Sequence, residues 1–136
     1  MRPGGGSGRG RPRANSIVIV DWVSLRDHQG EIERGALFRL PAQWPYEETV
    51  EFIVAEISPG SAGRIGLLVT TGHKAGLWVV SLPDEAQVPG RPWALSASWL
   101  RDNWTARVYA DTDPEQVRVC AGYPPPRDRL IERHGQ

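Results

Sequence analysis

Short apolar runs separated by glycine, proline and charged residues form the dominant pattern of this chain. The runs are too short for helices and are rich in β-branched and aromatic residues, which is typical of strands. They lie at residues 17–23, 36–40, 51–57, 65–71, 77–82, 107–110 and 117–121. The pattern predicts an α+β fold that is mostly β, with a largely antiparallel sheet and one or two short helices packed on it.

Two of these runs are expected to pair as a hairpin. Residues 65–71 and 77–82 flank the segment Gly72–Gly76, whose length suits a five-residue hairpin loop. Both runs are apolar at successive positions, which predicts central strands that are covered on each face. Trp78 is therefore predicted to be a core residue.

Two segments carry helix start signals. Ser96 offers a hydroxyl group for an N-terminal cap, and the apolar residues that follow up to Trp104 repeat at helical spacing. Farther along, Asp113 precedes Pro114, and proline is favoured at the first position of a helix. The strand-like run at residues 117–121 begins soon afterwards, so we expect only one helical turn there.

The two ends of the chain differ in composition from the middle. Residues 1–16 are rich in glycine, arginine and proline, and they predict a disordered basic tail because they can bury little apolar surface. Residues 124–136 begin with three prolines, and we expect a Pro-rich C-terminal tail that is loose or forms a frayed helical turn. A single domain is predicted between these tails, over residues 17–123.

The formal net charge of zero is a sum over unlike parts. The chain has 16 basic and 16 acidic residues, and residues 1–13 contain four arginines and no acid, so the rest carries an excess of four acids. The densest acidic cluster comprises Glu47, Glu48, Glu51 and Glu56, and a second comprises Asp84 and Glu85. No basic residue lies between Leu40 and Arg64 to oppose the first cluster. Such a cluster is usually a solvated face, and alternatively it steers a basic partner.

Candidate catalytic and metal-binding residues do not assemble into a site. His73 lies in a glycine-flanked loop, where it is either part of a solvated hairpin tip or a displayed functional residue. Cys120 alternates with small apolar residues in a strand-like run, which favours a packing role. A single cysteine can form neither an internal disulfide nor a zinc cluster. We therefore predict no enzymatic activity, no cofactor and no metal.

The chain also lacks sequence signals for a membrane. No apolar run approaches the roughly 20 residues that a membrane-spanning helix needs. The basic N-terminus has neither the apolar stretch nor the cleavage site of a secretory signal. A cytoplasmic protein without a membrane partner is expected.

The basic tail supports an alternative function. Arg9-Gly10-Arg11-Pro12 resembles the core of an AT-hook, a short extended segment that inserts arginines into the narrow minor groove of A·T-rich DNA. In this alternative the protein is a small nucleic-acid-associated protein that contacts DNA through Arg9, Arg11 and Arg13. The pattern is short and lies in a segment already rich in these residues, so a protein partner is the preferred interpretation over nucleic acid.

Several stretches of the middle domain together resemble a known family. They are GALFRLPAQWPYEETVE at residues 35–51, GHKAG at 72–76, WLRDNW at 99–104 and VRV at 117–119. The pattern resembles the immunity protein 45 family, whose members are encoded beside toxin genes in bacterial polymorphic toxin systems. The resemblance covers roughly residues 32–123, and His73 stands where a tyrosine is expected in that loop.

The resemblance implies a mostly β fold and a binding function without turnover. The partner would be a cognate toxin protein, encoded by an adjacent gene and neutralised inside the producing cell. Aromatic and charged side chains are favoured in binding hot spots and in steering. On that basis the hypothetical toxin-binding residues are Trp44, Tyr46, Glu47, Glu48, Glu51 and Lys74. A third possible class of function, besides an immunity protein and a nucleic-acid-associated protein, is an enzyme whose active site the sequence does not reveal.

Overall fold

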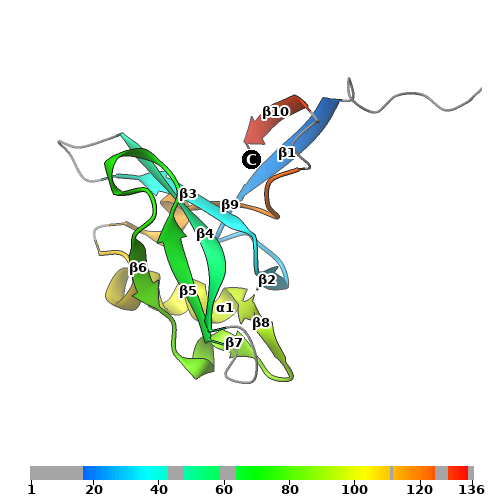
Figure 1. Ribbon diagram of the computed structural model, residues 1–136. Helices are drawn as coiled ribbons and strands as arrows, with labels where there is room; N and C mark the ends of the chain where they lie inside the picture. Colours follow the sequence, from blue (N-terminus) through cyan, green and yellow to red (C-terminus); the bar gives the residue numbers. More distant parts are fainter. Residues whose placement is uncertain (1–16, 43–47, 59–63, 111, 125–128, 135–136) are drawn as a thin grey trace, which may run out of the picture.

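The computed structural model describes residues 17–42, 48–58, 64–110, 112–124 and 129–134. Within these residues the strands form two sheets, and the larger has the order β10-β1-β9-β3-β4-β5-β6 (Figure 1). Its strands are β1 (Ile17–Ser24), β3 (Leu37–Pro41), β4 (Thr49–Ser58), β5 (Arg64–Val69), β6 (Trp78–Ser81), β9 (Arg118–Cys120) and β10 (Arg129–His134). The smaller sheet has the order β2-β8-β7 and comprises β2 (Glu31–Glu33), β7 (Gln87–Val88) and β8 (Arg91–Ser96).

The predicted fold class is confirmed. The neighbouring strands pair antiparallel except for β1 and β10, which pair in parallel. Among the described residues one α-helix is present, α1 (Ala97–Asn103), and it continues into a π-helical turn at Trp104–Val108. Short 3₁₀ turns lie at Gly72–Lys74, Asp84–Ala86 and Pro114–Gln116.

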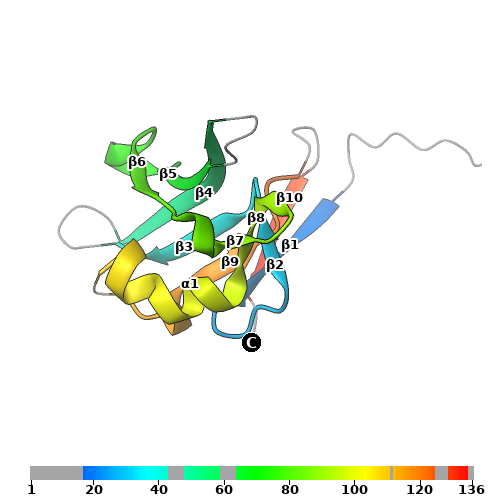
Figure 2. The same ribbon diagram turned by 90° about the horizontal axis from the view of Figure 1, so that it is seen from below.

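One face of the large sheet packs against α1 and forms the core. Phe38 and Phe52 are paired across β3 and β4 and are both buried, and the Phe38 ring lies 5.3 Å from the Trp104 ring. Leu100 of α1 is also completely buried in this cluster. Figures 1 and 2 show α1 on one side of β3, β4 and β9. We call this side the inner face.

The start of α1 follows the predicted capping pattern. The Ser96 hydroxyl accepts a hydrogen bond from the backbone N–H of Trp99 at 3.2 Å, which satisfies one donor of the first helical turn. The run at residues 107–110, which the sequence analysis predicts as a strand, instead lies partly in the π-helical turn that extends α1. The strand-like pattern at these residues is short. The helical conformation buries Trp104 and Val108 in the core, and this burial is worth more than the weak strand preference of the segment.

The prediction that residues 77–82 form a central strand of the sheet is wrong. β5 and β6 do pair, as expected, but β6 is the edge strand of the sheet. Trp78 is 45% exposed and Leu77 is 57% exposed, so neither belongs to the core. An unbroken apolar run does not distinguish a strand covered on both faces from an edge strand that presents apolar side chains to solvent.

The C-terminal segment also differs from its prediction. Residues Arg129–His134 form β10, which pairs in register with the first part of β1, rather than a loose tail or a helical turn. β10 is bonded to β1 alone, and in Figure 1 this two-strand ribbon extends away from the remainder of the sheet. The β-branched and leucine residues of the segment are few, which is why the sequence does not reveal the strand.

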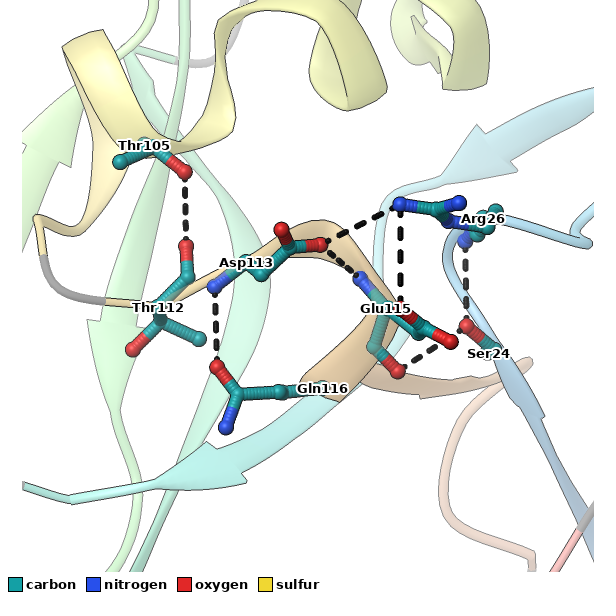
Figure 3. A network of polar contacts seen from close by, with 7 residues as sticks. All are labelled: Ser24, Arg26, Thr105, Thr112, Asp113, Glu115 and Gln116. Carbon is teal, nitrogen blue, oxygen red and sulfur yellow. Dashed lines mark hydrogen bonds and ion pairs between the residues drawn. The ribbon is translucent and has the colours of Figure 1, made fainter.

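The turn before β9 is fixed by a polar network (Figure 3). The Asp113 carboxylate accepts a hydrogen bond from the N–H of Glu115 at 2.9 Å, and the Gln116 side chain accepts one from the N–H of Asp113 at 3.1 Å. Asp113 and Pro114 thus begin one helical turn, as predicted. Arg26, which follows β1, lies 3.5 Å from Asp113, and the Ser24 hydroxyl donates to the Glu115 carbonyl. The network therefore holds β9 beside β1.

Candidate interaction surface

The side of the large sheet opposite α1 carries a row of polar residues. Arg118 of β9 is paired with Ser24 of β1 and with Arg39 of β3, and Arg39 is paired with Glu51 of β4. The N–H of Thr70, just after β5, donates to the Glu51 carbonyl and extends the row. Since successive side chains alternate between the faces of a sheet, these residues share one side. We call it the outer face.

Glu51 is the centre of this row. Its side chain is only 2% exposed, and its carboxylate accepts hydrogen bonds from Arg39 Nε at 2.9 Å and from the Thr70 hydroxyl at 2.7 Å. The Tyr123 hydroxyl donates to the same carboxylate. The Arg39 guanidinium also lies 4.4 Å above the centre of the Trp22 ring. The buried carboxylate thus accepts hydrogen bonds from several side chains and fixes the position of Arg39.

Tyr123 reaches Glu51 because the chain turns sharply before it. Gly122 has φ +147°, and a Cβ at this position would lie 2.9 Å from the Gly35 carbonyl oxygen. A side chain there would be strained and crowded, so glycine is required. Burial, together with the hydrogen bond to Glu51, raises the pKa of Tyr123 above its usual 10. The phenol therefore remains a hydrogen-bond donor at neutral pH.

A pocket of about 310 Å³ lies at the end of the polar row. Its lining consists of Arg39, Leu40, Pro41, Glu48, Thr49, Gln116 and Arg118. Arg39 is already paired with Glu51. In the part of the chain that the structure describes, no carboxylate forms an ion pair with Arg118, whose side chain is half-buried. Glu48 lines the same pocket but forms no ion pair with Arg118, so among the described residues this guanidinium has no carboxylate in direct contact.

An apolar strip runs beside the polar row on the outer face. Leu37, Ile53 and Leu68 follow one another across β3, β4 and β5, and Leu68 is paired with Trp78 of β6. Leu37 is buried with Trp22 and Cys120, whereas Ile53 and Leu68 are half-buried. The strip is therefore covered at its β3 end and increasingly exposed toward β6.

Trp78 lies against the sheet because residue 66 is glycine. A Cβ on Gly66 would lie 3.0 Å from Trp78 Cζ3 and 3.0 Å from Ile57 Cδ1. It would also lie 2.6 Å from the Val80 carbonyl oxygen, which real Cβ atoms do not tolerate. Gly66 thus makes room for the indole ring, which contacts the sheet on one side and is 45% exposed on the other.

The structure brings two of the predicted toxin-binding residues to the same end of the large sheet. Glu48 and Lys74 are both exposed, in the segments that precede β4 and follow β5. Because β4 and β5 are antiparallel, these segments meet at one end, as Figure 1 shows. Trp44, Tyr46 and Glu47 lie outside the described residues, as do the tail arginines Arg9, Arg11 and Arg13.

Glu51 requires a correction in its exposure. Its position in the sequence predicts a member of an acidic surface cluster, but its carboxylate is buried and paired with Arg39. Arg39 is the residue immediately before the stretch that lacks basic residues, so sequence distance conceals the pairing. Glu51 therefore contributes to the outer face through the groups that it holds in place.

Other acids of the two clusters are also paired. Glu56 lies 3.0 Å from Arg34, and Glu85 lies 2.9 Å from Arg107. The Arg107 guanidinium also lies 5.4 Å from the centre of the Trp99 ring. These contacts reduce the acidic character that the sequence suggests, because each pair presents little net charge to an approaching partner.

Arg39, Arg118 and Tyr123 are site residues that sequence reasoning did not identify. Arg39 and Arg118 are the single charged positions within LFRLP and RVC, two short strands that are otherwise almost wholly apolar. A charged residue inside an apolar strand is the signal that could have revealed them, because such a side chain must face solvent or a partner. No comparable signal exists for Tyr123.

The remaining candidate residues lie apart from this surface or are buried in it. His73 is exposed in the 3₁₀ turn between β5 and β6, and Cys120 is buried in β9. Among the described residues no group of three or more histidine, cysteine or acidic side chains could hold a metal ion. None of the helices in the described segments is long and apolar enough to cross a membrane.

Comparisons with known proteins agree with the resemblance seen in the sequence. The profile of the family described as immunity protein 45 matches residues 26–119, which include β2 to β8, α1 and the beginning of β9. Neither the search of curated proteins nor that of solved structures gave a match.

Proposed function

The chain belongs to the immunity protein 45 family, and we propose that it binds and neutralises a cognate bacterial toxin by non-covalent occlusion. The observation that carries this proposal is the family match, which spans most of the chain. The toxin would be the product of an adjacent gene in a polymorphic toxin system. Binding would take place in the cytoplasm of the producing cell, before the toxin leaves it, and without turnover.

Two of the proposed contact residues lie at the end of the large sheet where β4 begins and β5 ends. Glu48 and Lys74 are exposed there, and Glu48 lines the pocket that contains Arg118. Trp44, Tyr46 and Glu47 precede Glu48 in the chain and are kept as proposed contacts. Glu51 is buried in the same region. Its carboxylate fixes the positions of Arg39, through an ion pair, and of Tyr123, through a hydrogen bond from the hydroxyl.

Co-expression with the product of the adjacent gene tests the function. Cells that express this neighbour alone should stop growing, and cells that also express the full chain should recover. Normal growth with the neighbour alone would contradict the immunity function. A variant lacking residues 1–16 should protect equally well, whereas loss of protection would favour a function of the basic tail.

Stoichiometry separates occlusion from catalysis. In a titration of purified proteins, toxin activity should fall in proportion to the amount of this chain and reach zero at a fixed molar ratio. Separation of the complex in denaturant, followed by refolding of the toxin, should restore its activity. Inactivation of many toxin molecules by one copy of this chain would indicate an enzyme instead.

A further inference from the structure

We propose that the outer face, from Trp78 on β6 to Arg118 on β9, is the surface that binds the toxin. Its occupant is a toxin surface with apolar side chains at the centre and a carboxylate at one margin. This inference rests on the proposed function, because the toxin is the occupant to which it commits. It contains Glu51 and borders Glu48, which belong to the acidic cluster inferred from sequence, but it differs from that inference in the charge expected of the partner.

The two faces of the large sheet are covered unequally. The inner face packs against α1, whereas Ile53 and Leu68 on the outer face are half-buried and Trp78 is 45% exposed. In the views of Figures 1 and 2, neither α1 nor the small sheet lies on this side of β4 and β5. A contiguous apolar area on a folded protein marks an interaction site more often than isolated exposed residues do.

Trp78 rests against the sheet in the free protein, before any partner binds. Gly66 leaves room for the ring, which rests against the backbone of β5 and is 45% exposed to solvent. Ordering a flexible side chain on binding costs free energy, and a ring that is already fixed avoids much of that cost. Tryptophan, tyrosine and arginine are also the residue types most often found at binding hot spots, and the outer face carries all three.

The charge of Arg118 at one margin of the outer face is complementary to a carboxylate on the partner. Arg118 lines the pocket with Arg39 and Glu48, and no carboxylate within the described ranges, Glu48 included, forms an ion pair with it. A half-buried guanidinium gains most from a carboxylate that enters the pocket and forms two parallel hydrogen bonds. The partner is therefore expected to contribute an aspartate or glutamate at this margin.

The dimensions of the outer face fit one protein interface. Arg118 and Trp78 lie on β9 and β6, which are four strand spacings apart in the sheet. At roughly 4.8 Å per spacing this is about 19 Å, which lies within the width of a standard interface of about 800 Å² per partner. The face also adjoins Glu48 and Lys74, so one toxin could contact both regions.

Affinity measurements with the adjacent-gene product test the apolar part of the surface. Trp78→Ala should weaken binding by about 30-fold or more, as expected for an aromatic hot spot. The matched control is Trp93→Ala, because Trp93 is 39% exposed but lies on β8 of the small sheet. That control should change affinity by less than about threefold. Equal effects of both variants would overturn the assignment.

The charged part is tested by Arg118→Gln, with Arg26→Gln as its control. Arg26 lies beside the turn Pro114–Gln116, which precedes β9, and it pairs with Asp113 and Glu115 at the surface. Arg118→Gln should weaken binding by about tenfold, whereas Arg26→Gln should have little effect. Tighter binding by Arg118→Gln would show that the partner is basic at this margin and would overturn the charge assignment.

Failure of this inference can be distinguished from failure of the proposed function. If the wild-type chain does not bind the adjacent-gene product, the proposed function fails. If the wild type binds and the Trp78 and Arg118 variants bind equally well, only the surface is wrong. If the free chain forms a dimer that Trp78→Ala disrupts, a second copy covers this face and the inference is also overturned.

Hydrogen exchange provides a measurement that needs no substitution. In the complex with the wild-type chain, backbone amides of β5, β6 and β9 should exchange more slowly than in the free protein. Amides of α1 should be unchanged, because the helix lies on the inner face. Protection confined to α1 or the small sheet would place the toxin elsewhere.

Discussion

At the scale of single residues, Glu51 connects the fold to the outer face. Its carboxylate lies among three donors, from Arg39, Thr70 and Tyr123, and almost none of it is exposed. A charge in this position is stable only while its partners remain, because removing one of them leaves the others desolvated and unpaired. The neighbouring acid Glu48 is exposed, so the two glutamates should behave differently on substitution.

Replacement of these glutamates gives a direct comparison. Glu51→Ala should lower the free energy of unfolding by about 2 to 4 kcal/mol, because Arg39 and the Thr70 hydroxyl lose their acceptor. Glu48→Ala should change it by less than about 0.5 kcal/mol, as is usual for an exposed residue. Urea denaturation followed by tryptophan fluorescence measures both. Similar losses for the two variants would contradict the buried network.

His28 gives a prediction for pH. Burial, with the Arg101 guanidinium nearby, lowers the pKa of His28 below its usual 6.5. As the pH falls below about 6.5, this histidine takes up a proton more readily in the unfolded chain than in the folded protein. Its contribution to the free energy of unfolding is therefore fully present above that pH and is lost as the solution is acidified. In His28→Gln, urea midpoints at about pH 8 and about pH 5 should differ less than in the wild type. An unchanged difference would rule out this contribution.

At the scale of elements, local signals predicted the beginnings of helices better than the places of strands. Ser96 and Asp113 each cap a turn as expected, because capping depends on residues close in sequence. The edge position of β6 depends on which strand follows β5 in space, and the pattern of residues 77–82 carries no information about that. The β10 strand likewise depends on β1, far away in the chain.

The cap of α1 can be tested with two serines. Ser96→Ala should lower the free energy of unfolding by about 1 kcal/mol, because the Trp99 N–H loses its acceptor. Ser98 is exposed in the first turn, and its hydroxyl lies 3.0 Å from that of Ser96 but accepts no bond from a helical N–H, so Ser98→Ala should be less destabilising than Ser96→Ala. Thermal unfolding monitored by circular dichroism compares the variants. If Ser98→Ala is the more destabilising, the assigned cap is wrong.

The pairing of β10 leads to a prediction about local stability. Since β10 is bonded only to β1, a chain that ends at Pro124 should retain the rest of the sheet. Backbone amides of residues 17–20 should then exchange faster with solvent, while those of β3 and β4 keep their protection. Hydrogen exchange measured by mass spectrometry tests this. Loss of protection throughout the sheet would show that β10 supports the whole fold.

At the scale of the whole molecule, pairing decides how the charges act. The acids that the sequence places in clusters are in part matched by arginines from distant segments, such as Arg34 beside Glu56 and Arg107 beside Glu85. The cation of Arg118 is balanced by no ion pair within the described residues. The distribution of charged residues along the sequence therefore predicts that the domain has a net negative charge. It does not predict which face of the domain would attract a charged partner.

Two exposed acids far apart on the surface test this view. Glu48 borders the Arg118 pocket, whereas Asp84 lies in the 3₁₀ turn before β7. Glu48→Lys should speed association with the toxin by roughly two- to fivefold at low salt, because it removes a charge that repels the expected carboxylate. Asp84→Lys should have a smaller effect, since salt screens distant charges. Stopped-flow measurements would contradict this if Glu48→Lys slowed association.

The alternation of side chains along β4 has a consequence for how such proteins diversify. Phe52 and Val54 face the core, while Ile53, Ala55 and Ile57 lie on the side that we assign to the toxin. One strand therefore carries two nearly independent sets of positions. Relatives that resist different toxins should differ most at the second set and keep the first, because recognition can drift while the constraints of folding stay in force.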